Sequence, residues 1–267
     1  MFTSSLLTEP GVHEKAMRAR FGDDVMFTGD SPVFDTPLYL LAFCNRSGSN
    51  LLASHLRSTR YFGGFHEQLN AVTVEKQSEI HNIATNPDYI RTMTAHHMGN
   101  NKVYGFKASW DQMMMLLRFG IDRMYTGVQV IHITRADVLK QAISYHIAVQ
   151  TKQWTSKQDG LDVEPVYDAH QITRLMEESA RSEMAVRQIC AMLDIPRMHV
   201  RYETLVRDPE AVVQRAARFA DTNLGKWRPK EPPIQKQSNE INNVFYDRYV
   251  AEQRAALRGA APATNGF

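Results

Sequence analysis

The order of apolar and polar residues along the chain predicts short strands that alternate with amphipathic helices. Strand-length segments occur four times, at Leu38–Phe43, Val103–Phe106, Val128–Ile133 and His199–Tyr202. Strands that are apolar along most of their length are typical of parallel sheets buried on both faces. We therefore expect an α/β fold in which a central parallel sheet is flanked by helices, arranged like a P-loop protein.

Helical periodicity fills the segments between these strands. The expected helices cover residues 14–21, 51–59, 110–119, 137–154, 172–193, 208 onward and 244–257. Asp208 is the expected N-cap of its helix, with Pro209 at the first helical position. We expect an N-terminal extension at 1–36, a single domain at 37–257, a disordered tail at 258–267, and a loop or lid at 155–168.

Composition and charge narrow the class of protein. The 267 residues are 43% hydrophobic and 22% charged, as in ordinary globular proteins, and the two cysteines fit a reducing compartment. No signal-peptide pattern and no apolar run of bilayer length is present, so a cytoplasmic location without a membrane span is expected. A net charge of +2 disfavours nucleic acid as a partner but leaves room for a small anionic ligand.

A short polar loop between the first strand and its helix is the strongest local signal. It reads Arg46-Ser47-Gly48-Ser49-Asn50. Such a loop directs several backbone N–H groups and the positive end of the helix dipole at one point, which suits a phosphate or sulfate. An ordinary strand-to-helix turn with a serine cap is the alternative interpretation. A Walker A loop is excluded, because its glycine-lysine-serine/threonine ending is missing.

A second candidate anion site follows the strand Val128–Ile133. Arg135 ends this strand, and the next helix carries Ser144 on one of its faces. Asp137 is expected to cap that helix. In an open parallel sheet such positions line the ligand crevice, so Arg135 and Ser144 are candidates to bind a second phosphate. A surface ion pair of Arg135 with Asp137 or another acid is the alternative.

Four blocks of sequence together resemble the PAPS-dependent sulfotransferases, and most closely the bacterial family typified by trehalose 2-sulfotransferase. The four blocks cover residues 40–52, 105–112, 131–154 and 236–239. The resemblance implies the sulfotransferase fold, sulfuryl transfer from 3′-phosphoadenosine 5′-phosphosulfate (PAPS) to a hydroxyl of a carbohydrate or glycolipid, and a homodimer. It implies no metal, and the pair His96-His97 lacks further ligands at metal-binding spacing.

The same resemblance assigns roles to individual residues. Glu67 matches the position of the family's catalytic base, and Lys107 is expected either to hold the sulfuryl group or acceptor, or to serve a structural role. The expected PAPS-binding residues are Arg46, Ser47, Gly48, Ser49, Asn50, Leu51, Arg135, Ser144 and Gln237.

The chain departs from the family pattern around the acceptor. His66 precedes Glu67 where the family has a glutamine, Ile147 replaces an arginine, and Asn50 stands where a serine or threonine is usual. His66 is a competing candidate for the base, because an unperturbed imidazole titrates near neutrality. Two other functions stay open on sequence grounds: a P-loop-type small-molecule kinase and a nucleotide-binding protein without catalysis.

Overall fold

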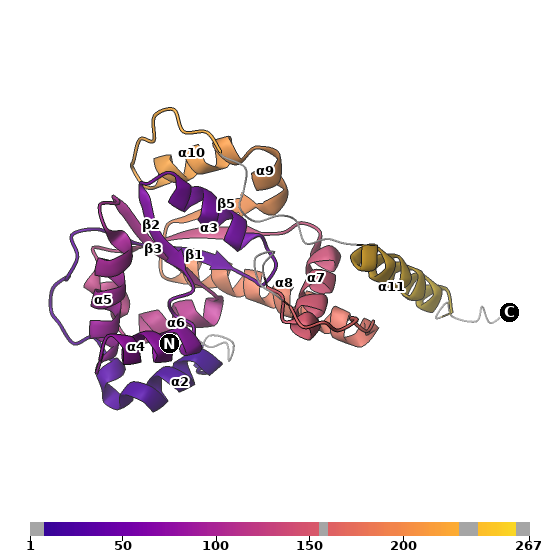
Figure 1. The fold of residues 1–267 in the computed structure, drawn as a ribbon, viewed down its shortest axis with the longest axis horizontal. Coiled ribbons are helices and arrows are strands. Elements are labelled where there is room, and N and C mark those ends of the chain that lie inside the picture. Colours follow the sequence, from indigo (N-terminus) through magenta and orange to yellow (C-terminus); the bar gives the residue numbers. More distant parts are fainter. Residues whose placement is uncertain (1–7, 155–159, 230–239, 260–267) are drawn as a thin grey trace, which may run out of the picture. The chain divides into compact units, whose positions relative to one another are not determined.

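The computed structural model describes residues 8–154, 160–229 and 240–259 (Figure 1). Within them the chain forms two compact units. The larger contains the described residues of 1–136 and 180–233, and the smaller those of 137–179 and 234–267. We describe each unit by itself.

The larger unit is built on a sheet of five parallel strands. They are β1 (Leu38–Phe43), β2 (Phe62–His66), β3 (Val103–Ala108), β4 (Val128–Thr134) and β5 (Arg197–Arg201). The strand order is β2-β3-β1-β4-β5, and every neighbouring pair is parallel. The predicted fold class and the first three predicted strands are confirmed. The fourth, predicted at His199–Tyr202, is present as β5 with shifted bounds, because Tyr202 begins a helix. Strand β2 was not predicted.

Side chains of the central strand β1 alternate between two hydrophobic cores, as the period of a strand requires. Leu38, Leu40 and Ala42 belong to one core, whereas Tyr39, Leu41 and Phe43 belong to the other. All six residues are buried. The alternation explains why this strand is apolar throughout its length, since helices cover it on both faces.

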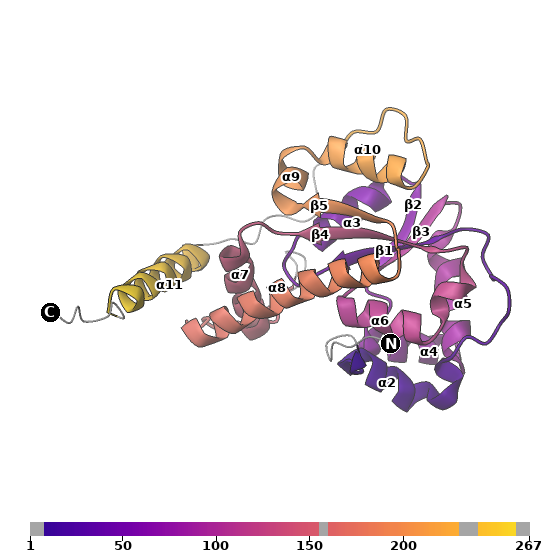
Figure 2. The same cartoon turned by 180° about the vertical axis from the view of Figure 1, so that it is seen from behind.

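Different helices cover the two faces of the sheet. On the Leu41 face lie α3 (Ser49–Ser58), α9 (Tyr202–Arg207) and α10 (Pro209–Phe219), the last two beside β5 (Figures 1 and 2). Residues of α2 (Val12–Phe21), α4 (Ala71–Ile80), α5 (Asn86–Met98), α6 (Trp110–Arg118) and the C-terminal part of α8 (Ala169–Met192) share the Leu40 core. Two 3₁₀ helices, η1 (Gly22–Val25) and η2 (Ile121–Met124), join this layer.

Local capping explains where several of these helices begin. Asp208 accepts a hydrogen bond from the Ala211 N–H, and Pro209 occupies the first turn, as predicted. Helices α4 and α5, which periodicity did not predict, begin at Asn70 and Thr85, whose side chains accept from backbone N–H groups. Their buried faces mix apolar and polar side chains, such as Val74 with Ser78 in α4 and Met93 with Thr94 in α5, so the apolar periodicity is weak.

The described part of the expected N-terminal extension packs into the core of the larger unit. Met17 and Phe21 of α2 are buried in the Leu40 core. Glu14 is only 1% exposed and forms ion pairs with Arg18 and Arg118. A buried carboxylate is tolerated when cations and hydrogen bonds compensate for its lost hydration. This segment therefore stabilises the sheet from one side.

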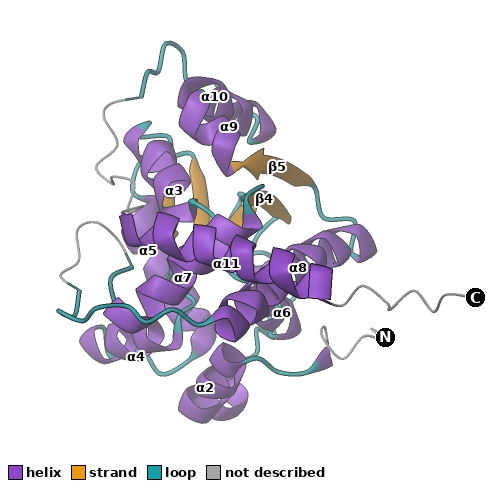
Figure 3. Cartoon of the chain, turned by 90° about the vertical axis from the view of Figure 1, so that its right-hand side faces the viewer, coloured by secondary structure: helices purple, strands orange, loops and turns teal. Residues whose placement is uncertain are grey.

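The smaller unit contains α7 (Val138–Thr151), the first part of α8, and α11 (Glu240–Gly259). Its core includes Ile143, Ile172, Phe245 and Tyr249. Asp137 accepts a hydrogen bond from the Lys140 N–H and is the N-cap of α7, as predicted. Figure 3 shows the helices of the chain in one colour. None of the described helices is long and apolar enough to cross a bilayer.

Candidate active site

The carboxyl ends of all five strands carry the candidate residues that lie in the larger unit. The loop 44–48 follows β1, Glu67 follows β2, Lys107 lies near the end of β3, Arg135 follows β4, and Tyr202 follows β5. The strand order changes direction at β1: β2 and β3 lie on one side of β1, and β4 and β5 lie on the other. Ligands of open α/β sheets bind at such a switch point, outside the carboxyl ends of the strands.

The loop after β1 presents a set of backbone donors. Gly48 is the N-cap of α3 with φ +90°, a left-handed conformation that suits glycine, and no side chain caps this helix. The first intrahelical acceptor is the Gly48 carbonyl, which accepts from Leu52. The N–H groups of Ser49, Asn50 and Leu51 in the first turn therefore have no partner within the helix, and the helix dipole adds positive potential there.

Two buried polar atoms at this end of the sheet lack a hydrogen-bond partner within the described chain. They are the Ser47 hydroxyl, whose residue is fully buried, and Nε of Arg135. Buried polar groups are almost always paired in native proteins, so each unpaired one calls for an explanation. A bound anion that accepts from both groups would provide it. The residues present therefore fit an anionic ligand.

Arg46 and Arg135 place two cations beside this loop. Burial lowers the pKa of Arg46, and the charge of Arg135 lowers it further. The Arg135 guanidinium lies 5.1 Å from the centroid of the Tyr202 ring, and its Nη1 is 3.5 Å from the Arg46 carbonyl oxygen. Two guanidinium groups that repel one another in a buried site are stabilised by an anion between them.

Tyr202 is a site residue that the sequence analysis missed. A Cβ atom added to Gly48 would lie 2.3 Å from Cδ2 of Tyr202, so the ring is packed directly against this glycine. The ring also faces Arg135. Tyr202, at the start of α9, therefore packs against both the loop and Arg135. Its sequence signal is weak, because an aromatic residue at the start of a helix is read as core packing.

Lys107 is the most buried cation of the site. Its side chain is 3% exposed, and Nζ donates to Glu67 Oε1 at 2.6 Å and to Asn50 Oδ1 at 2.5 Å. Nζ also lies 4.5 Å from the centroid of the Phe43 ring. Burial lowers the pKa of Lys107, although the nearby carboxylate of Glu67 acts to raise it. The Asn50 side chain, a departure from the family pattern, therefore has a specific partner.

A bulge at the end of β2 positions Glu67. The pairing of β2 with β3 shifts register between Gly64 and His66, and both Gly64 and Phe65 have positive φ. Positive φ is unfavourable for a bulky residue such as Phe65, and bulges commonly re-aim side chains next to active sites. Arg57 donates to the Phe65 carbonyl at 3.0 Å and holds this turn of the backbone. The result is a Glu67 side chain, 45% exposed, that meets Lys107.

His66 lies beside Glu67 but in an electropositive environment. Its pKa is lowered to about 4 by desolvation first, and then by the charges of Arg57, His97 and Lys107. The residue as a whole is nevertheless exposed. An imidazole with so low a pKa is a weak base at neutral pH, which makes His66 the poorer candidate for accepting a proton.

The remaining predicted residues do not all join this cluster. Leu51 is half-buried and packs against the Leu41 core through α3. Ser144 lies on α7 in the smaller unit. Gln237 lies outside the described residues, as does part of the expected lid, residues 155–159. Among the described residues, no group of three or more His, Cys, Asp or Glu side chains could hold a metal ion.

Comparison with known protein families identifies the group to which this arrangement belongs. The sequence profile described as Stf0 sulphotransferase matches residues 38–252, from the first residue of β1 into α11. The chain belongs to the Stf0 sulphotransferase family. The matched segment contains every candidate site residue described above.

Two relatives of this Stf0 protein are trehalose 2-sulfotransferases. The one from Mycobacterium tuberculosis (strain Erdman) is 29% identical over 168 residues, which cover 57% of this chain and 62% of the relative. The one from Mycolicibacterium smegmatis is 26% identical over 269 residues, covering 84% of this chain and 97% of the relative. The first match thus spans less than two thirds of the relative's length.

Solved structures show that the Stf0 protein has the fold of other sulfotransferases. The sulfotransferase domain of the Synechococcus PCC 7002 olefin synthase superposes with a TM-score of 0.51 at 13% identity, over 90% of this chain and 94% of that domain. The sulfotransferase domain from the curacin biosynthetic pathway gives 0.50 at 15% identity, over 78% and 82%. The expected P-loop-like sulfotransferase fold is confirmed.

Proposed function

We propose that this protein transfers a sulfuryl group from PAPS to a hydroxyl of a carbohydrate or glycolipid, with Glu67 as the general base. The observation that carries the proposal is that one lysine connects the anion-binding segment with the proposed base. Lys107 bonds both to Asn50 in the loop after β1 and to Glu67 after β2. One lysine therefore links the anion-binding loop to the carboxylate that would activate the acceptor.

The donor would bind at the carboxyl end of β1. The N–H groups of residues 48–51, the Ser47 hydroxyl and Arg46 suit the 5′-phosphosulfate, because all of them donate hydrogen bonds or carry positive charge. Arg135 suits the 3′-phosphate, which distinguishes PAPS from ATP. Ser144 and Gln237 remain proposed contacts to the same donor, assigned by resemblance alone.

The transfer step is a displacement at sulfur. The acceptor oxygen forms a bond to the sulfur atom while the bond between sulfur and the bridging phosphate oxygen breaks. Glu67 accepts the proton of the attacking hydroxyl, since an alcohol is a poor nucleophile until its proton is removed. The products are the sulfate ester and 3′-phosphoadenosine 5′-phosphate. The negative charge that develops on the departing phosphate is stabilised by Arg46 and the backbone donors.

The contacts of Lys107 suggest that it orients the base and supplies a positive charge during the transfer. Its ion pair with Glu67 orients the carboxylate. Once Glu67 is protonated during transfer, Lys107 keeps a positive charge near the sulfuryl group. Preorganised charges of this kind act mainly on the transition state, where charge is redistributed.

A carbohydrate acceptor is proposed from the relatives, which are trehalose 2-sulfotransferases. We keep a cytoplasmic location and a homodimer as further proposals. Cys44 and Cys190 are both buried, and a single pair of cysteines is too few for a disulfide framework, which fits a reducing compartment. Membership of a sulfotransferase family disfavours the kinase alternative. The arrangement of Glu67 and Lys107 favours catalysis over simple nucleotide binding.

A product assay tests the proposal directly. The protein is incubated with PAPS and a panel of mono- and disaccharides, and release of 3′-phosphoadenosine 5′-phosphate is measured together with sulfated sugar. We expect acceptor-dependent release without added metal ions. Nucleotide release from Mg²⁺-ATP in place of PAPS, or no release with any acceptor, would refute the proposal.

A further inference from the structure

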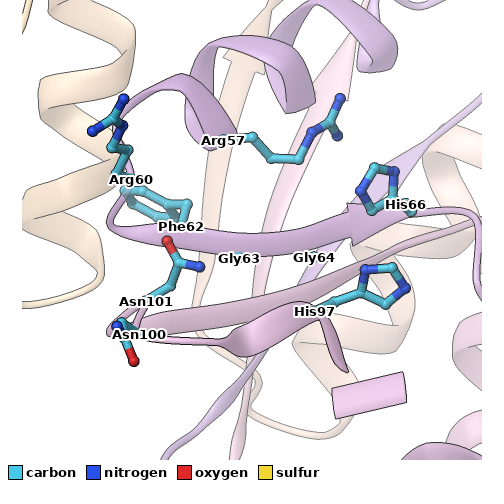
Figure 4. A pocket seen from close by; sticks show the side chains of 9 residues that line it. All are labelled: Arg57, Arg60, Phe62, Gly63, Gly64, His66, His97, Asn100 and Asn101. Atoms are coloured by element: carbon cyan, nitrogen blue, oxygen red, sulfur yellow. The ribbon is translucent and has the colours of Figure 1, made fainter. Parts of the chain in front are cut away.

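A pocket lies along β2, the edge strand that directly precedes Glu67. Its volume is about 400 Å³, which is in the range of small-molecule sites. The backbone of Gly63 and Gly64 forms one wall, and the side chains around it include Arg57, His66 and His97 (Figure 4). None of the residues proposed to bind PAPS lines this pocket.

The charge of the pocket lining is entirely positive. Arg57 and Arg60 both line it, whereas no aspartate or glutamate does. Arg57 uses Nη1 to donate to the Phe65 carbonyl, and its other nitrogens have no described partner. The Arg60 side chain forms no hydrogen bond or ion pair within the described chain. Figure 4 shows the two guanidinium groups at different ends of the pocket, with that of Arg57 directed toward His66 and His97. A guanidinium group on a concave surface without a carboxylate creates a site for an anion.

Two histidines line one end of the pocket, with their ring planes tilted by 47°. The ring centroids of His66 and His97 lie 5.3 Å apart, and Figure 4 shows both rings on the side toward which Arg57 points. The charge of Arg57 helps to lower the pKa of His66 to about 4, and burial lowers that of His97. A bound anion would reverse this effect, because opposite charge favours the protonated imidazole. The histidines would then add donors to those of Arg57.

The pocket adjoins the proposed base. His66 lines the pocket and is followed directly by Glu67, and Arg57 is close enough to Lys107 for its charge to lower the lysine pKa. The charge of Lys107, the ion-pair partner of Glu67, also acts on His66, so the histidine end of the pocket lies near the Glu67 carboxylate. This is the place from which an acceptor hydroxyl would be presented.

We infer that the acceptor is an anionic sugar, whose phosphate or carboxylate binds in this pocket to Arg57, His66 and His97 while a hydroxyl lies at Glu67. The inference rests on the proposed function, since it names the chemical class of the acceptor. Phosphate and carboxylate are treated together, because both accept the paired hydrogen bonds of a guanidinium group. The two are separated by experiment.

Binding is tested first, without any donor. The side-chain signals of His66 are followed by NMR as a function of pH in the presence of trehalose, trehalose 6-phosphate, methyl glucoside or methyl glucuronide, with inorganic phosphate as a further probe. We expect the His66 pKa to rise by about one unit or more with the anionic sugars and to stay unchanged with the neutral ones. An equal rise with inorganic phosphate alone would show an anion site without sugar recognition and would overturn the inference.

Turnover is tested second, with matched histidine variants. His97→Gln removes a ring from the histidine end of the pocket, and His81→Gln removes an exposed histidine that does not line it. We expect His97→Gln to lower the ratio of kcat/KM for the anionic over the neutral sugar by about tenfold, as loss of a hydrogen bond to a charged acceptor implies, and His81→Gln to leave it unchanged. A ratio that is the same in both variants would overturn the inference.

The two readouts separate the inference from the proposed function. If neutral sugars are sulfated and the His66 pKa does not respond to anionic ones, the proposed function stands and the anionic acceptor is refuted. If the His66 pKa rises with an anionic sugar but no acceptor releases nucleotide from PAPS, the anion pocket stands and the sulfotransferase activity is refuted.

Discussion

Lys107 and Glu67 form an ion pair between a buried cation and a half-exposed carboxylate, with Nζ 2.6 Å from Oε1. Burial of the lysine costs free energy, because an ammonium loses its hydration, and its lowered pKa reflects that cost. Such an arrangement contributes little to stability and has to be explained by function. Together with the bond from Lys107 to Asn50, the pair joins the first turn of α3 to the end of β2, two segments that no backbone ladder connects directly.

Replacing Lys107 by methionine separates stability from activity. We expect Lys107→Met to keep the free energy of unfolding within about 1 kcal/mol of the wild type or to raise it, because an apolar side chain of similar length removes a buried charge. Activity should fall by about a hundredfold or more, since one preorganised charge is lost. Urea denaturation and steady-state assays at pH 7.5 measure the two effects.

The pH dependence gives a second signature of the same variant. The folded protein holds the lysine at a pKa below its unfolded value of about 10.4, so the unfolded state binds more protons between the two values and stability rises with pH across that window. Lys107→Met should lose this rise, and Lys102→Met, at an exposed position, should keep it. A loss of more than about 2 kcal/mol for Lys107→Met at pH 7.5 would contradict the argument.

The identity of the base is tested by replacing each of two neighbouring residues in turn. Glu67→Gln keeps the shape of the side chain but cannot accept the proton, so kcat should fall by about 10² to 10⁴ while affinity for 3′-phosphoadenosine 5′-phosphate changes little. His66→Gln should retain kcat within about tenfold, because an imidazole with a pKa near 4 is a weak base. The opposite ranking of the two variants would assign the role to His66.

Parts of the site that are formed by residues close together in the sequence could be predicted, whereas contacts between distant segments could not. The loop after β1 was predicted because strand, glycine and helix follow one another within a few residues. The bonds of Lys107 to Asn50 and Glu67 could not be predicted, because they depend on the register of β3 against β1 and β2. Strand register is set by tertiary packing and is only weakly encoded in a single parallel strand.

Strand β2 shows a different limit of sequence reasoning. Its residues, Phe62 to His66, include two adjacent glycines and too few apolar side chains to give a strand pattern. The glycines are needed where other backbone approaches closely: a Cβ atom on Gly63 would lie 2.6 Å from the His97 carbonyl oxygen. The bulge and the pocket beside it depend on the same two glycines. The residues that obscure the strand pattern in the sequence are therefore the ones that shape the site.

Removing the Ser47 hydroxyl should weaken nucleotide binding without weakening the fold. Its buried oxygen has no partner within the described chain, so Ser47→Ala removes an uncompensated polar group and should leave the free energy of unfolding unchanged or slightly higher. Affinity for 3′-phosphoadenosine 5′-phosphate should fall by about tenfold or more, the value of a hydrogen bond to a charged acceptor. Calorimetric titration measures it.

A serine at the other end of the same helix provides the control. Ser58 donates its hydroxyl to the His55 carbonyl and lies at the end of α3, so Ser58→Ala should leave nucleotide affinity unchanged. If Ser47→Ala destabilises the unliganded protein by more than about 1 kcal/mol, its hydroxyl has a structural partner and the argument fails.

The contact between Gly48 and Tyr202 predicts a steric and a conformational effect that can be separated. Gly48→Ala adds a Cβ at φ +90° and drives it into the Tyr202 ring, so the free energy of unfolding should fall by about 1 to 3 kcal/mol. The double variant Gly48→Ala/Tyr202→Ala should recover the steric part relative to the sum of the single changes, which chemical denaturation measures as a coupling free energy.

Gly127→Ala is the matched control for this pair, because a Cβ there would meet no atom within 4 Å and its φ is not positive. It should leave stability within about 0.5 kcal/mol of the wild type. Additive effects of the Gly48 and Tyr202 changes would show that the ring is not packed against the loop.

A buried histidine in β4 should make the protein sensitive to acid. His132 is 1% exposed, its Nε2 lacks a partner within the described chain, and burial followed by the charges of Arg197, His199 and Arg187 lowers its pKa to about 3. The folded state therefore binds fewer protons than the unfolded state between pH 3 and about 6.5, and stability falls as the pH is lowered through this window.

Replacing His132 by leucine should remove this acid penalty. For a folded pKa of about 3 and an unfolded pKa of about 6.5, the penalty at pH 5 is about 2 kcal/mol. Relative to the wild type, the free energy of unfolding of His132→Leu should therefore be about 2 kcal/mol more favourable at pH 5 than at pH 7.5. His170→Gln, on the exposed surface of α8, should follow the wild type at both pH values. Urea denaturation at the two pH values measures the difference, and parallel curves for His132→Leu and wild type would mean that His132 is protonated in the folded protein.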